Sequence, residues 1–61
     1  MNGKQAIKIL EKLGFSIIRI NGSHHMLSDG IHRVTVPVHG TQELKPGTLK
    51  SIEKQSGVTL K

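Results

Sequence analysis

The sequence predicts an α+β fold of order α-β-β-β-α, in which two helices cover one face of a three-stranded antiparallel sheet. Helix-period apolar residues lie near both ends of the chain, and two hairpin dipeptides with β-branched runs lie between them. With 61 residues the chain is near the lower size at which one core folds unaided. We therefore expect one domain over 1–61, with no targeting segment and no membrane span.

The first helix is predicted over 2–13, where apolar residues recur at helical spacing. These residues are Ala6, Ile7, Ile9, Leu10 and Leu13. Asn2 with Gln5 three residues later is typical of a capping box at a helix start. Gly14 followed by Phe15 is typical of a helix that ends on a left-handed glycine with a hydrophobic residue packed back on it.

Residues 15–38 are predicted to form a meander, because the hairpin dipeptides Asn21-Gly22 and Asp29-Gly30 separate runs rich in Ile, Val and Thr. A proline near the end of the third run suits an edge strand or a strand end.

After a loop over 39–45, the second helix should begin near Pro46, which suits the first helical turn. Leu49 and Ile52 should face inward, and Gly57 with Val58 repeats the glycine-then-hydrophobic stop signal.

Counting across two-residue turns predicts that Arg19 and Thr35 flank His24 on the central strand. The covered face should then hold Ile18, Ile20, Leu27, Val34, Val36 and Val38. The open face should hold Arg19, His24, Met26, Arg33 and Thr35. His25 should be partly buried and bonded to a backbone carbonyl, whereas His32 and His39 should be surface residues.

A histidine beside a cation and a hydroxyl is a useful arrangement for cleaving RNA. The ordinary pKa of imidazole is about 6.5, so the side chain can accept or donate a proton at neutral pH. Arg19 would stabilise charge on the phosphate, and Thr35 or Ser23 would orient it. The plainer alternative for His24 is a solvated strand histidine on a basic surface.

Lys45 and Thr48 lie at the predicted start of the second helix, where free N–H groups and the helix dipole can bind a phosphate. A simple helix start with a proline is the alternative for this segment.

Nine Lys and Arg against four Asp and Glu give a net charge of +5, which attracts RNA or an acidic protein. Phe15 is the one aromatic residue, so backbone and shape recognition is favoured over base stacking. Cysteine is absent, which excludes disulfides and a thiol nucleophile and fits a reducing cytosol. We expect no metal and no cofactor, because His24 and His25 point to opposite faces and the carboxylates lie on separate elements.

Segments spread over almost the whole chain carry a resemblance to a known family. They are Leu10-Glu11-Lys12-Leu13-Gly14-Phe15, Arg19, Gly22-Ser23-His24, Val34-Thr35-Val36-Pro37-Val38-His39, Glu43-Leu44-Lys45, Gly47-Thr48-Leu49, Ile52 and Gly57. Together they resemble the HicA mRNA interferase toxins, which pair with HicB antitoxins.

The resemblance implies a double-stranded-RNA-binding-like fold and the toxin of a type II toxin–antitoxin system. It implies a metal-independent endoribonuclease that cleaves mRNA and arrests translation, with His24 as the catalytic residue. Supporting or RNA-binding residues would be Arg19, Gly22, Ser23, Thr35, Lys45 and Thr48. The toxin would act in the cytoplasm, as a monomer alone and as a hetero-oligomer with a HicB-type antitoxin that covers the active face.

Two other functions remain open on the sequence. One is a binding module of the same fold that grips duplex RNA through Lys45 and the second helix without cutting it. The other is an interaction protein whose lysines dock an acidic partner.

Overall fold

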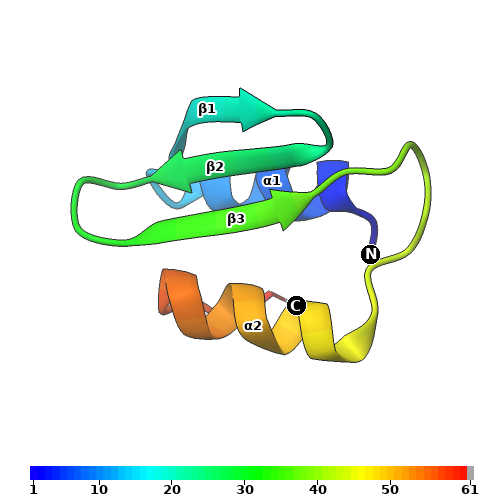
Figure 1. The fold of residues 1–61 in the computed structure, drawn as a ribbon. Coiled ribbons are helices and arrows are strands. Elements are labelled where there is room, and N and C mark those ends of the chain that lie inside the picture. The colour runs from blue at the N-terminus through cyan, green and yellow to red at the C-terminus, as the bar shows by residue number, and fades with distance from the viewer. Residues whose placement is uncertain (61) are drawn as a thin grey trace.

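A computed structural model describes residues 1–60 and has the predicted order of elements, a helix, three strands and a helix (Figure 1). The elements are α1 (Gly3–Lys12), β1 (Ser16–Asn21), β2 (His24–Ser28), β3 (Arg33–Pro37) and α2 (Pro46–Ser56). Lys61, the last residue of the predicted 1–61 domain, lies outside the described residues. Figure 1 shows α1 behind the sheet and α2 running alongside β3. No helix within 1–60 combines the length and the hydrophobicity that crossing a bilayer requires.

Both predicted ends of α1 are confirmed. The Asn2 side chain accepts from the Gln5 N–H at 2.9 Å, and the Gln5 side chain accepts from the Asn2 N–H at 2.9 Å. At the other end Gly14 has a φ of 98°, and the Phe15 N–H donates to the Leu10 carbonyl at 3.0 Å. Phe15 is buried, so the hydrophobic residue after the glycine packs back onto the helix as expected.

The predicted pairing of β1 with β2 is wrong by two residues. The turn is formed by residues 22–23, so that Asn21 lies opposite His24 and Arg19 lies opposite Met26. Gly22 has a φ of 61°, which places glycine at the first central position of the turn. A two-residue hairpin with glycine in that position matches the twist of the strands, and it moves the turn one residue beyond the predicted dipeptide.

The predicted pairing of β2 with β3 is also wrong by two residues. Thr35 lies opposite Met26, and the residue opposite His24 is Pro37. The cause is a four-residue turn over 29–32 in place of the predicted two-residue turn.

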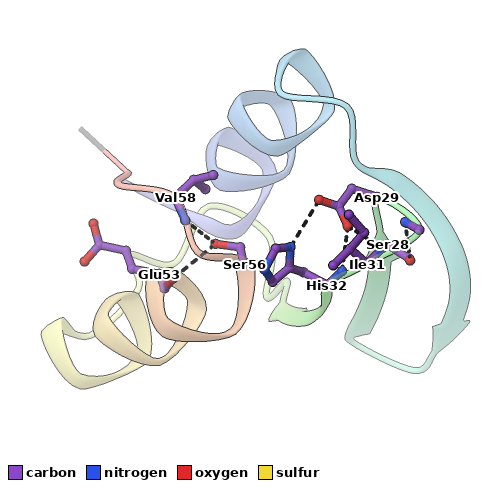
Figure 2. Close-up of polar contacts among 8 residues, drawn as sticks. Ser28, Asp29, Ile31, His32, Glu53, Ser56 and Val58 are labelled. Atoms are coloured by element: carbon purple, nitrogen blue, oxygen red, sulfur yellow. Dashed lines mark hydrogen bonds and ion pairs between the residues drawn. The ribbon is translucent and has the colours of Figure 1, made fainter.

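Side-chain hydrogen bonds account for the longer second turn (Figure 2). One oxygen of Asp29 accepts from the N–H groups of Ile31 at 2.8 Å and His32 at 2.6 Å, and the other oxygen lies 3.3 Å from the His32 ring. The Ser28 hydroxyl accepts from the Gly30 N–H at 3.0 Å. Aspartate and serine often bond backbone groups a few residues ahead in this way, which here extends the loop.

The predicted faces survive in β3 and in residues 19–21 of β1, because a shift by an even number of residues leaves each side chain on its own face. Before the irregularity in β1 the shift is one residue, so Ile17 is the residue that pairs with Leu27. Leu27, Val34 and Val36 are fully buried on the covered face. They pack with residues of both helices and the segments next to them, namely Ala6, Ile7, Leu10, Phe15, Ile52 and Leu60. One core therefore lies between the sheet and the helices.

Ile18 and Ile20 were predicted to belong to the core, and that prediction is wrong. Their exposed fractions are 52% and 59%, and all of β1 is exposed. Both helices pack against β3, which lies on the far side of β2 from β1. The pairing of β1 is irregular between Ile17 and Arg19, so Ile18 has no partner on β2. β1 consequently extends beyond the cover that the helices provide.

The predicted boundaries of α2 are confirmed. Pro46 occupies the first turn, and the helix ends at Gly57, which has a φ of 76°. Ile52 is buried, and Leu49 and Val58 pack against the core as partly buried residues.

The helix α2 also protects the open edge of the sheet. β3 is an edge strand, and the N–H of Thr35 donates to the Gln55 side chain at 3.1 Å. The Gln55 amide in turn donates to the Ser51 hydroxyl at 2.9 Å. Pro37 has no N–H to satisfy, which confirms the expectation that it suits an edge strand. These contacts leave fewer unpaired groups for another strand to bind.

Gly3 is required where α1 meets the end of β3. A Cβ at Gly3 would overlap the Pro37 carbonyl oxygen and lie 3.0 Å from a Val38 methyl group, whereas a Cβ at Gly47 would meet nothing within 4 Å. We predict that Gly3→Ala lowers the free energy of unfolding by about 1–3 kcal/mol through overpacking. The control Gly47→Ala should be neutral or stabilise by about 0.4–1 kcal/mol. Urea unfolding measures both, and equal stabilities for the two variants would contradict the close approach.

Asp29 should make stability depend on pH in the acid range. Its backbone bonds from His32 and Ile31 lower its pKa from 3.8 to about 2. Because the folded-state pKa is depressed, the stabilisation is present above pH 3.8 and is lost as the pH falls through about 2. The difference in melting temperature between the wild type and Asp29→Ala should therefore narrow across that interval. The exposed Glu11→Ala should show no such narrowing, and a constant difference for Asp29→Ala would contradict the role of the ionised carboxylate.

Candidate functional site

His24 begins the central strand and projects from the open face of the sheet. Leu27, three residues later, is fully buried under the helices, and alternation along β2 therefore turns His24 to the opposite side. The His24 side chain is exposed, as predicted. Its direct cross-strand neighbours are Asn21 and Pro37, and not Arg19 and Thr35 as the predicted pairing had it.

The open face carries a hollow of about 350 Å³, which we call the His24 hollow. It is lined by Arg19, Asn21, His24, Met26 and Thr35. Arg19, Met26 and Thr35 form one row across the three strands, and His24 lies in the next row. Diagonal neighbours of this kind have Cα atoms about 7–8 Å apart, within reach of long side chains. Arg19 and Thr35 thus share the hollow with His24, although neither lies directly opposite it.

A second hollow of about 270 Å³ lies at the start of α2, and we call it the Lys45 hollow. It is lined by Pro37, His39, Gln42, Glu43, Leu44, Lys45 and Thr48. Lys45 is the N-cap of α2 and its side chain makes no capping hydrogen bond. The first N–H groups of a helix point outward and carry partial positive charge, so this end of α2 suits an anion.

Pro37 connects the two hollows. It is the cross-strand partner of His24 and also lines the Lys45 hollow. The predicted site residues are therefore brought together in two neighbouring groups, with Arg19, His24 and Thr35 in one and Lys45 and Thr48 in the other.

Gly22 and Ser23 line neither hollow. They form the turn that leads into β2, and the Ser23 carbonyl accepts from the Val38 N–H at 2.7 Å. Their visible contribution is to fix the chain immediately before His24.

A comparison with known protein families identifies the family of the chain. Residues 3–58 match the family described as the HicA toxin of bacterial toxin–antitoxin systems. The chain belongs to the HicA toxin family. The matched range includes both hollows and the turn before His24, and membership implies an antitoxin partner. No match was found among the curated proteins.

Two other histidines of this HicA toxin lie away from the open face. His25 is half-buried beside Val36, and its ring lies 3.4 Å from the Ser23 carbonyl oxygen, as predicted. His32 contacts Asp29 in the second turn (Figure 2). Its ring also lies 3.4 Å from the place where Gly57 would carry a Cβ. His32 therefore links the β2–β3 turn to the end of α2.

Sequence reasoning missed two members of the site. Asn21 was assigned to a turn, but it ends β1 and lines the His24 hollow. His39 was assigned to the surface, and it is exposed, but it also lines the Lys45 hollow. For both residues the missed signal was strand alternation, in which residues two positions apart point to the same side. Asn21 is two residues after Arg19, and His39 is two residues after Pro37. Within 1–60, no three residues of the types His, Cys, Asp and Glu group closely enough to hold a metal ion.

Proposed function

We propose that this HicA toxin is a metal-independent endoribonuclease that cleaves mRNA and arrests translation, with His24 as its catalytic residue. One observation carries the proposal. An exposed imidazole projects from the central strand into a hollow that it shares with a guanidinium and a hydroxyl, those of Arg19 and Thr35.

The chain contains the kind of group that this chemistry requires. The ribose 2′-oxygen attacks the adjacent phosphorus, the bond from phosphorus to the 5′-oxygen breaks, and the products are a 2′,3′-cyclic phosphate and a 5′-hydroxyl. One proton leaves the 2′-hydroxyl and one is added to the 5′-oxygen. Histidine performs either transfer at neutral pH, and such help ordinarily contributes about 10² to 10⁴ in rate.

The neighbours of His24 have complementary tasks. The Arg19 guanidinium would bind phosphate oxygens and stabilise the charge that builds on them in the transition state. The Thr35 hydroxyl and the Asn21 amide would orient the backbone of the bound strand. Gly22 and Ser23 would support the site by fixing the turn before His24.

A flanking phosphate would bind in the Lys45 hollow. There the Lys45 ammonium, the Thr48 hydroxyl and the N–H groups of α2 lie together, and Pro37, the cross-strand partner of His24, lines the same hollow. RNA would thus contact the protein through its backbone at two hollows, consistent with the net charge of +5.

The second candidate is a non-catalytic module that binds duplex RNA. The Lys45 hollow favours it, because a lysine at a helix N-terminus binds phosphates whether or not the strand is cut. This alternative gives no role to the imidazole in the His24 hollow.

We propose that the antitoxin is of the HicB type and covers the open face, which would block RNA from His24. The toxin would then be a monomer when free and part of a hetero-oligomer when inhibited. Its place of action would be the cytoplasm, where mRNA is translated.

Replacement of His24 tests the enzyme against the binding module. Purified protein incubated with an mRNA in EDTA should cleave it, and His24→Gln should cleave about 10² to 10⁴ times more slowly while keeping its melting temperature. His25→Gln is the matched control, since the same change one residue later lies on the covered face. Equal cleavage by the wild type and His24→Gln would refute the assignment, and binding without cleavage by the wild type would favour the module.

Replacement of Arg19 tests the proposed phosphate contact. Arg19 is exposed, so Arg19→Ala should change stability by no more than about 0.5 kcal/mol. It should slow cleavage and weaken RNA binding. The slope of a plot of the logarithm of the binding constant against the logarithm of the salt concentration should become shallower by about 1. Lys12→Ala removes an exposed cation from α1 and should leave cleavage unchanged. A large fall in melting temperature for Arg19→Ala would mean that its side chain is not on the open face.

A further inference from the structure

RNA cleavage by the proposed route needs two proton transfers, and the His24 hollow holds one group suited to them. The other residues that line it are Arg19, Asn21, Met26 and Thr35, none of which exchanges protons readily at neutral pH. A second proton-transfer group must therefore come from outside this hollow, if the protein supplies one.

The Lys45 hollow contains three titratable side chains. The Glu43 carboxylate pairs with the α-ammonium group of Met1, and Lys45 is assigned above to phosphate binding. The third is His39, whose side chain is exposed. Imidazole is the side chain best matched to proton transfer near pH 7.

The strand pairing brings His39 to the same face as His24. His24 lies opposite Pro37, and the hydrogen bond from the Val38 N–H to the Ser23 carbonyl continues the ladder one residue beyond the end of β3. Alternation then places His39 on the side of Pro37, with which it shares the Lys45 hollow. If this extended pairing is continued by one more residue, His39 becomes the diagonal neighbour of His24, and diagonal neighbours have Cα atoms about 7–8 Å apart.

The backbone around His39 is held in place. The Gln42 N–H donates to the His39 carbonyl at 3.0 Å, which closes a turn through Gly40, whose φ is 58°. On the other side, α1 packs closely on Pro37 at Gly3. The position of His39 relative to His24 is therefore set by backbone contacts and not by the side chains alone.

We propose that His39 is the second proton-transfer residue of the reaction, acting with His24 across the scissile phosphate. This inference rests on the proposed nuclease function. One imidazole is neutral and accepts the 2′-hydroxyl proton while the 2′-oxygen bonds to phosphorus. The other is protonated and donates to the 5′-oxygen while the bond from phosphorus to that oxygen breaks. The two residues exchange protonation states, so the step balances without a metal ion or a further reactant.

The test uses the intact chain and a short single-stranded RNA containing a site that the wild type cleaves. His39→Gln should stay folded and cleave this RNA about 10² to 10⁴ times more slowly. A plot of the wild-type cleavage rate against pH should be bell-shaped, with a rising limb and a falling limb. The same plot for His39→Gln should lack one of these two limbs. Thr41→Ala, in the same exposed loop, is the control and should match the wild type in both respects.

A second substrate identifies proton donation directly. In this RNA, sulfur replaces the bridging 5′-oxygen at the cleaved bond, so that departure of the leaving group no longer requires protonation. Whichever histidine is the donor becomes dispensable, and therefore only one of His24→Gln and His39→Gln should recover to within about tenfold of the wild type.

The outcomes separate this inference from the proposed function. If the wild type cleaves and needs His24, but His39→Gln behaves like Thr41→Ala, the inference alone is refuted. It is also refuted if His39→Gln is slow but keeps both limbs of the pH profile, or if the sulfur substrate rescues both variants or neither. A wild type that does not cleave RNA at all overturns the nuclease function and this inference with it.

Discussion

The burial of Leu27 determines how the rest of the sheet is used. Leu27 lies on the central strand and is fully buried beneath the helices, so strand alternation forces His24 to the opposite, open face. Turning β2 over would expose Leu27, at a cost of about 1.5–3 kcal/mol, and would bring His24 under the helices. In a chain of 61 residues with one small core, that penalty is a large part of the total stability. The position of the proposed catalytic residue is therefore a consequence of core packing.

The sequence was sufficient to predict the elements, their caps and the two faces of the sheet. The capping box at Asn2, the glycine at Gly14 and the proline at Pro46 are local signals. Each of them determines where a helix begins or ends through contacts within a few residues. Strand pairing was predicted less well, because a hairpin register depends on turn length, and the hydrogen bonds of Asp29 lengthen the second turn. Most side chains still face as expected, since apolar and polar residues alternate with a period of two and the shifts were even except before the irregularity in β1.

Other features depend on how whole elements pack, which local signals do not encode. Ile18 and Ile20 have the composition of core residues, but the helices lie over β2 and β3 and leave β1 uncovered. Likewise the requirement for Gly3 follows from the contact of α1 with the end of β3, two segments far apart in the chain. The inferred approach of His39 to His24 depends on a contact of the same kind, the hydrogen bond from Val38 to Ser23 that extends the pairing past Pro37.

The central claim is that RNA binds to the open face of the sheet, against His24. Chemical-shift mapping tests it most directly, using isotope-labelled protein and an RNA whose 2′-hydroxyl groups are methylated so that it binds but is not cleaved. The His24 ring and the amides of Arg19 and Thr35 should shift as RNA is added, whereas buried Ala6, on the helix side, should not. Shifts confined to α1, with the His24 ring unmoved at saturating RNA, would contradict the claim.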